Sequence, residues 1–117
     1  MPCTWFSGRF ILRKTTSRGR GEVTAPEEAK VHVVIHGRVQ GVGYRFWTLD
    51  EANRRGLGGW VRNLPDGTVE AVFGGPAGTV DDMVAACWRG PAWAKVTAID
   101  VQATEEQGLP IPFEFRR

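Results

Sequence analysis

The stretch Gly37–Arg45, with the sequence GRVQGVGYR, carries the strongest structural signal in the chain. Before it, Val31, Val33 and Ile35 alternate with polar residues, which is typical of a strand. After it, residues 44–55 place apolar side chains three positions apart, which is typical of a helix. The stretch is therefore predicted to be a glycine-rich loop that leads from a strand into a helix.

The first helix is predicted to bury Phe46, Leu49 and Ala52 on one side, and Arg55-Gly56 fits its end. Two strands are expected next, joined by a turn in which proline presets φ and glycine accepts a positive φ. We assign them to residues 60–64 and 68–73, on either side of Pro65-Asp66-Gly67.

A second helix is predicted from Thr79, which forms a capping-box pattern with Asp82 three residues later. Apolar residues then follow with the spacing of one helix face, and Gly90-Pro91 ends the pattern. They are Val80, Met83, Val84, Cys87 and Trp88. Residues 96–103 read as a further strand, and residues 111–115 as a short edge strand.

This order of strands and helices predicts an α+β fold of the ferredoxin-like, split βαβ type (βαββαβ). The expected architecture is an antiparallel sheet with two helices on one face. Right-handed crossovers would place the first and third strands side by side in the middle of the sheet.

The composition fits one globular domain, since 117 residues with 42% hydrophobic and 24% charged residues are ordinary values. No apolar run approaches the length of a membrane span. The net charge of +2 comes from the start of the chain, because residues 30–117 carry equal numbers of basic and acidic residues. A neutral domain gives no electrostatic reason to expect nucleic acid as a partner.

We expect residues 1–29 to form a disordered extension and residues 30–117 to form the domain. The first 21 residues include arginines and serines but no acidic residue, which also resembles a transit peptide. An upstream start codon chosen in error is a further reading of this segment.

The loop has the features of a phosphate site. Glycines let a ligand approach the backbone closely, and successive N–H groups form a concave anion site. The first turn of a helix adds unpaired N–H groups and a partial positive charge. Arg45 would lie in that turn, where a cation is unfavourable unless an anion binds, and its guanidinium matches two phosphate oxygens. The loop lacks the lysine and Ser/Thr of a P-loop, which disfavours a nucleoside triphosphatase.

Asn63 lies near the end of a predicted strand, where asparagine is disfavoured. Its amide could support the following turn, or it could hold a water molecule with one donor and one acceptor. His32 and His36 lie on one side of a strand but about 13 Å apart, too far to share a metal. We expect them on the less covered face of the sheet, and we expect no metal site.

The loop and the segment Gly59–Glu70, with the sequence GWVRNLPDGTVE, together resemble the two signature motifs of the acylphosphatase family. The resemblance extends from about Val31 to Arg117. It implies the same ferredoxin-like fold, with Arg45 binding the phosphoryl group and Asn63 orienting the attacking water. It also implies a phosphate cradle formed by the backbone amides of Arg38, Val39, Gln40, Gly41, Val42, Gly43 and Tyr44.

The resemblance further implies an enzyme without a cofactor that hydrolyses acyl phosphates to a carboxylate and inorganic phosphate. With only two cysteines, a reducing and hence cytoplasmic compartment is the default expectation. Such a leaving carboxylate has a conjugate acid of pKa about 4 and needs little general-acid help. We expect a monomer with no nucleic-acid or membrane partner, and other high-energy phosphates stay open as substrates. The alternative is a catalytically silent ferredoxin-like module that binds protein or nucleic acid, because fold alone does not decide function.

Overall fold

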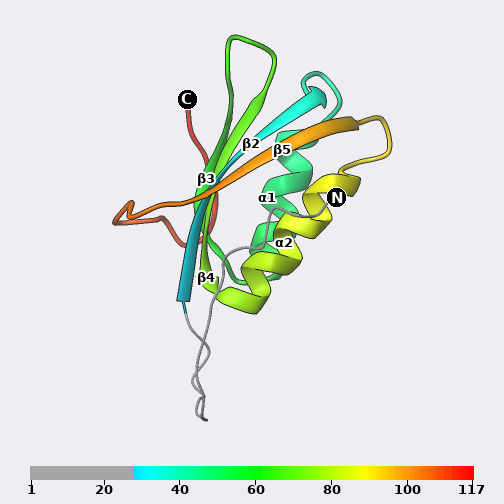
Figure 1. The fold of residues 1–117 in the computed structure, drawn as a ribbon. Coiled ribbons are helices and arrows are strands. Elements are labelled where there is room, and N and C mark those ends of the chain that lie inside the picture. Colours follow the sequence, from blue (N-terminus) through cyan, green and yellow to red (C-terminus); the bar gives the residue numbers. More distant parts are fainter. Residues whose placement is uncertain (1–27) are drawn as a thin grey trace.

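The computed structural model describes residues 28–117. The expectations for residues 1–27 therefore lie outside the described residues, whereas Glu28 and Ala29, expected in the extension, are part of β2. The chain forms β2 (Glu28–Arg38), α1 (Tyr44–Arg54), β3 (Gly58–Asn63), β4 (Val69–Pro76), α2 (Ala77–Arg89), β5 (Lys95–Ala103) and β6 (Glu114–Phe115). This order confirms the predicted α+β, ferredoxin-like arrangement (Figure 1).

The sheet has the strand order β5-β2-β4-β3-β6, so that the first and third predicted strands are neighbours in its interior. The four long strands pair in antiparallel fashion, as expected. The edge strand β6 differs, because it pairs with β3 in parallel, with Trp60 opposite Glu114. The predicted antiparallel sheet is thus confirmed for the four long strands and does not extend to this edge strand. A long connection after β5 brings the chain around to run beside β3 in the same direction.

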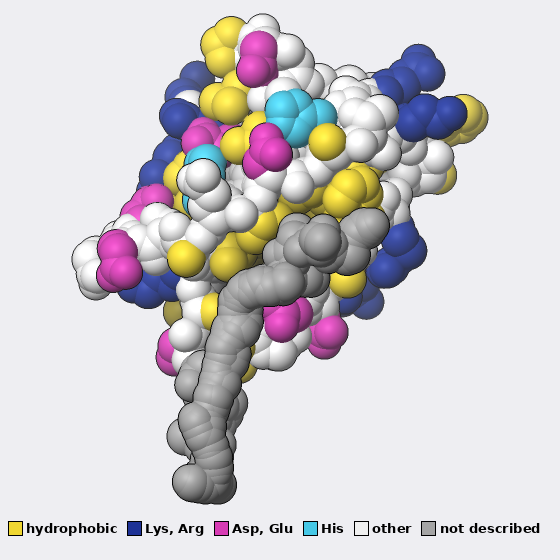
Figure 2. Space-filling view, viewed as in Figure 1, with side chains coloured by type: hydrophobic (Ala, Val, Ile, Leu, Met, Phe, Trp, Pro, Cys, Tyr) yellow, Lys and Arg dark blue, Asp and Glu magenta, His cyan; other side chains and the backbone are white. Residues whose placement is uncertain are grey.

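Both helices lie on one face of the sheet (Figure 1), where Val33 and Ile35 are fully buried. The alternation of β2 places His32 and His36 on the opposite face, which confirms their expected position. His32 Nε2 lies 2.6 Å from Glu70 Oε2, and His36 Nε2 lies 2.9 Å from Asp100 Oδ2. Both imidazoles are visible at the surface in Figure 2, each beside an acidic side chain.

The buried face of α1 agrees with the predicted one for Ala52, which is buried, and for Leu49, which packs against the core, but not for Phe46. Tyr44, Thr48 and Ala52 are buried at a spacing of four, whereas Phe46 is 67% exposed. The Phe46 ring instead meets the Phe115 ring, with centroids 5.0 Å apart. The prediction failed because a spacing of three fits several faces of an amphipathic helix, and packing against the sheet selects one of them.

Helix α2 begins at Ala77, two residues before the predicted cap, with Pro76 at the N-cap and no side-chain capping hydrogen bond. The capping-box prediction was therefore wrong, because Thr79 already lies inside the helix. The predicted apolar face is buried at four of its five positions, and the fifth, Trp88, is 43% exposed. Ala86, which was not predicted to face the core, is also buried.

The end of α1 follows the predicted Arg55-Gly56 signal. The backbone N–H of Gly56 donates to Asn53 O at 3.1 Å, and that of Leu57 donates to Ala52 O at 3.0 Å. This pair of bonds is a Schellman motif, which satisfies carbonyl groups at the helix end. Leu57 is fully buried, so that the chain turns directly into β3.

Candidate active site

The predicted anion loop connects the end of β2 to the first residue of α1. Gly41 and Gly43 have φ angles of 74° and 81°, in the left-handed region that favours glycine. A Cβ atom at either position would have no neighbour within 4 Å, so the backbone of the loop is open to an approaching ligand on that side. Gly43 is also the N-cap residue of α1, and no side chain caps that helix. The unpaired N–H groups of its first turn are thus left for a ligand.

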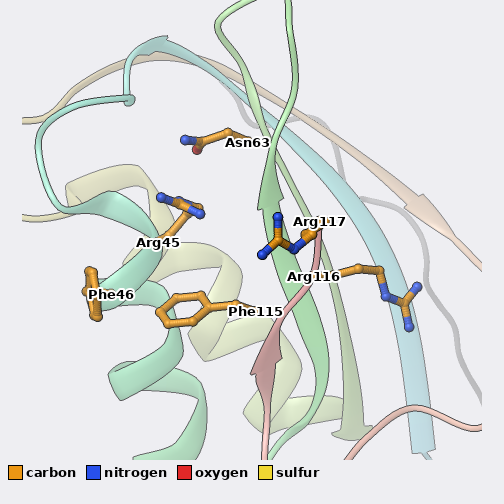
Figure 3. Close-up of a pocket in the computed structure, with 6 residues that line it drawn as sticks. All are labelled: Arg45, Phe46, Asn63, Phe115, Arg116 and Arg117. Carbon is orange, nitrogen blue, oxygen red and sulfur yellow. The ribbon is translucent and has the colours of Figure 1, made fainter.

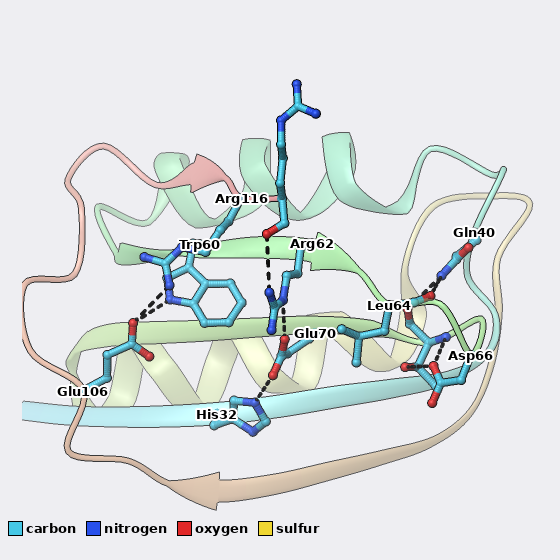
Figure 4. A network of polar contacts seen from close by, with 11 residues as sticks. His32, Gln40, Trp60, Arg62, Leu64, Asp66, Glu70, Glu106 and Arg116 are labelled. Carbon is cyan, nitrogen blue, oxygen red and sulfur yellow. Dashed lines mark hydrogen bonds and ion pairs between the residues drawn. The ribbon is translucent and has the colours of Figure 1, made fainter.

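Side chains fix the loop at two points. Val39 is buried in the core. The side-chain amide of Gln40 donates to Leu64 O at 2.8 Å and to Thr68 O at 2.9 Å (Figure 4). Gln40 was predicted only as a backbone contact for phosphate, and nothing in the sequence identified this second role. Its side chain joins the loop to the β3–β4 hairpin.

The hairpin turn is itself held by Asp66, whose Oδ1 accepts from Thr68 N at 3.0 Å and from Thr68 Oγ1 at 2.6 Å. The side-chain hydrogen bond from Thr68 is the main reason that the pKa of Asp66 lies below its usual range. Leu64 N also donates to Thr68 O at 2.9 Å, which closes the turn.

Tyr44 has a buried side chain, so only its backbone is available to the cradle. Its hydroxyl donates to Cys87 O at 2.6 Å and links α1 to α2. Burial raises the pKa of Tyr44 far above its ordinary value and also raises the pKa of the Cys87 thiol to about 12. Both groups are therefore neutral anchors of the fold.

Arg45 is the second residue of α1, whose first turn contains no acidic residue. Within residues 28–117 its guanidinium takes part in no hydrogen bond or ion pair, and its Cζ lies 5.8 Å from the centroid of the Phe115 ring. A cation at a helix N-terminus is opposed by the helix dipole. This position therefore favours a bound anion beside Arg45.

Asn63 is the last residue of β3, where it pairs with Val69, and its side chain is exposed. Figure 3 shows its amide and the Arg45 guanidinium on the same side of the sheet, next to the loop. Both side chains line one pocket of about 460 Å³. The structure thus brings the two residues singled out in the sequence to one site.

Four further residues line this pocket: Phe46, Phe115, Arg116 and Arg117. Sequence reasoning placed Phe46 in the core and gave the other three no role. Phe115 lies in β6, and Arg116 and Arg117 follow it. These three residues reach the site through the parallel pairing of β6 with β3. In the sequence, residues 115–117 read Phe-Arg-Arg, and so short a segment carries no pattern that would place it beside the loop.

No group of three or more His, Cys, Asp or Glu side chains that could hold a metal is found among residues 28–117. Cys87 is a free, buried thiol on α2. In the same part of the chain, no helix is long and apolar enough to cross a membrane.

The glycine-rich loop, the arginine at the helix start and the strand-end asparagine are the features expected of a phosphate-binding protein with a ferredoxin-like fold. Comparison with known proteins agrees. The acylphosphatase family model matches residues 31–114. This chain belongs to the acylphosphatase family.

The most similar proteins found include two bacterial acylphosphatases. One, from Nitrobacter hamburgensis, is 60% identical over 70 residues, which is 60% of this chain and 71% of the relative. Another, from Rubrobacter xylanophilus, is 45% identical over 103 residues, covering 88% of this chain and 94% of the relative. The crystal structure of acylphosphatase from Bacillus subtilis is similar with a TM-score of 0.71 at 36% identity, over 75% of this chain and 98% of that chain.

Proposed function

We propose that this protein hydrolyses acyl phosphates to a carboxylate and inorganic phosphate in the pocket beside the loop. The phosphoryl group would accept hydrogen bonds from the backbone amides of residues 38–44 and from the Arg45 guanidinium. The side chain of Asn63 would orient the attacking water. The observation that carries this proposal is the guanidinium of Arg45, which lies unpaired, within the described residues, beside the loop and Asn63.

The chemistry needs these groups and little else. Water attacks phosphorus in line with the acyl oxygen, the bond between phosphorus and that oxygen breaks, and its electrons leave with the carboxylate. Since the conjugate acid of the leaving group has a pKa of about 4, no general acid is needed. The proton released by the water passes to a phosphoryl oxygen. The protein contributes alignment and stabilisation of the phosphoryl charge.

We further propose that the reaction is independent of metal ions and that the enzyme is a cytoplasmic monomer. The metal-independent part is supported by the pocket itself, into which the side chains of Arg45 and Arg117 extend and which no Asp or Glu side chain lines. The arginines can supply the positive charge that a hard cation supplies elsewhere. The alternative of a silent binding module has no comparable support, because the pocket retains both Arg45 and Asn63.

The test is hydrolysis of benzoyl phosphate by purified protein in EDTA, with Arg45→Ala prepared in parallel. The variant is expected to lose at least about a hundredfold in kcat/KM, because it lacks a donor aimed at the transferred group. Arg54→Ala is a matched control, since Arg54 is an exposed arginine on the same helix, paired with Glu51. A folded wild-type protein without turnover, or an Arg45→Ala variant as active as Arg54→Ala, would contradict the proposal.

A further inference from the structure

Arg117 places a second unpaired guanidinium in the pocket. Within residues 28–117 its side chain makes no hydrogen bond or ion pair, as is also true of Arg45. Figure 3 shows it extending into the space that Arg45 lines, on the side of Arg45 and Asn63 that faces away from the loop. Two cations in one pocket without an acidic lining residue repel each other and create a positive field that favours anions.

The position of Arg117 is held by its backbone. Arg62 Nη1 donates to the backbone oxygen of Arg117 at 3.3 Å, and Arg62 Nε donates to Glu70 Oε1 at 2.5 Å (Figure 4). Glu70 is fixed in turn by His32 on the open face of the sheet. The network therefore anchors the main chain at Arg117 and leaves its guanidinium available to the pocket.

The neighbouring Arg116 shows what a structural arginine looks like in this segment. Its Cζ lies 4.4 Å from the centroid of the Trp60 ring, and its Nη1 lies 3.3 Å from Glu106 Oε2. Figure 3 shows its side chain directed away from Arg45. The Arg116 guanidinium thus has partners in Trp60 and Glu106, whereas the Arg117 guanidinium has no hydrogen bond or ion pair among residues 28–117.

The phosphoryl group has a complete set of donors without Arg117, namely the loop amides, the start of α1 and Arg45. Beyond Arg45 the pocket continues along the rings of Phe46 and Phe115, whose centroids lie 5.0 Å apart. These rings offer an apolar wall to the acyl part of a substrate. Arg117 is thus placed to meet whatever the acyl part carries at its far end.

We propose that Arg117 is a specificity-determining residue that binds a second anionic group, such as a carboxylate, on the acyl part of the substrate. The preferred substrates are then acyl phosphates of acids that bear a further negative charge. This inference rests on the proposed function, because it assigns the acyl side of the same site.

The experiment compares two substrates of equal size, 4-carboxybenzoyl phosphate and its neutral analogue 4-carbamoylbenzoyl phosphate. Their rigid rings keep the second group away from the anhydride, so neither can cyclise. The measured quantity is the ratio of kcat/KM for the charged substrate to kcat/KM for the neutral one. In the wild-type protein this ratio is expected to exceed one and to fall as salt concentration rises.

Arg117→Gln is expected to lower the ratio about tenfold, which is the size of one partly exposed charge-assisted hydrogen bond. Arg117→Lys should retain much of the ratio because it keeps the charge. Arg116→Gln is the matched control and should leave the ratio as in the wild type, since that guanidinium is directed elsewhere.

Two results would overturn the inference while leaving the proposed function in place. One is an unchanged ratio in Arg117→Gln. The other is an equal loss on both substrates, which would assign Arg117 to the phosphoryl group. Absence of turnover on both substrates by the folded wild-type protein would instead refute the proposed function, and the inference with it.

Discussion

The side-chain amide of Gln40 donates a hydrogen bond to the backbone oxygen of Leu64, the residue that follows Asn63, at 2.8 Å. Its second acceptor is the backbone oxygen of Thr68 at 2.9 Å. One side chain of the loop thus fixes the distance between the phosphate cradle and the residue proposed to orient water. Small errors in such a distance are costly for a reaction that depends on alignment.

Gln40→Ala should therefore lower both activity and stability. Removing the amide leaves two carbonyl groups without this donor, which should cost about 1 kcal/mol in the free energy of unfolding. We expect kcat/KM for benzoyl phosphate to fall about tenfold or more as the loop loses its register with the hairpin. Urea denaturation and steady-state kinetics would measure the two effects.

Gln107→Ala is the control for this prediction, because Gln107 is exposed and, among residues 28–117, its side chain bonds only to the nearby Glu105 O. Wild-type kinetics in Gln40→Ala would show that the loop keeps its position without the amide.

Asn63→Ala should reduce kcat more than it reduces binding of inorganic phosphate. The side chain is exposed at the end of β3, so its loss should leave the fold intact. A residue that orients water contributes mainly after the phosphoryl group is bound, and a kcat loss of about a hundredfold is expected. Product inhibition by phosphate measures binding separately. A parallel loss of phosphate inhibition would assign Asn63 to phosphate binding instead.

Tyr44→Phe should affect stability without removing activity. The variant keeps the buried ring but deletes the hydroxyl that donates to Cys87 O at 2.6 Å. A buried carbonyl left without this donor should cost about 1–3 kcal/mol in the free energy of unfolding. Thermal or urea denaturation tests this directly. A large fall in kcat at temperatures where the variant is folded would mean that the hydroxyl acts in the site.

The Glu70 carboxylate should make stability depend on pH in the acid range. Burial alone would raise its pKa, but hydrogen bonds from His32 and Arg62 outweigh that effect and lower it from the ordinary 4.5. A folded-state pKa below the unfolded one stabilises the protein fully above pH 4.5, and this contribution is lost as pH falls through the folded value. Urea denaturation between pH 3 and 7 should therefore show a shallower acid decline for Glu70→Gln than for the wild type.

Glu105→Gln provides the comparison for Glu70→Gln, because Glu105 is an exposed carboxylate in the loop after β5. Identical acid slopes for Glu70→Gln and the wild type would show that the network around Glu70 does not distinguish the two protonation states.

Removal of residues 1–27 should leave kcat/KM for benzoyl phosphate unchanged. Every residue proposed for the site lies within residues 28–117. The cut should come before Glu28, because Glu28 and Ala29 already pair with Pro76 and Gly75 in the sheet. Steady-state kinetics on the shortened and full chains would test this, and a large loss would give the first 27 residues a part in the fold or the site.

Local patterns predicted the elements well wherever sequence neighbours decide the conformation. The loop glycines, the turn at Pro65-Asp66-Gly67 and the Arg55-Gly56 helix end are of this kind. The failures concern tertiary packing. The exposure of Phe46 depends on which face of α1 the sheet accepts, and the direction of β6 depends on a long connection with no periodic signal.

The site divides in the same way. Arg45 and Asn63 could be put forward as candidates because the loop gives Arg45 a local reason and the resemblance to the family's two motifs adds Asn63; both line the same pocket. The role of Gln40 could not be predicted, since its partners Leu64 and Thr68 are defined only by the folded hairpin. The pocket positions of Phe115 and Arg117 were equally hidden, because strand pairing across the whole domain brings them to the loop.

The parallel pairing of β6 with β3 brings together two segments of the site that lie far apart in the sequence. The residues proposed for phosphoryl binding and water orientation lie within residues 38–63, whereas two residues of the proposed acyl side, Phe115 and Arg117, lie after β5. Phe113 anchors this segment by stacking on Phe73, with ring centroids 5.5 Å apart. Randomising position 117 in a library should therefore change which acyl groups are accepted while the proposed phosphoryl site, built from other segments, stays in place.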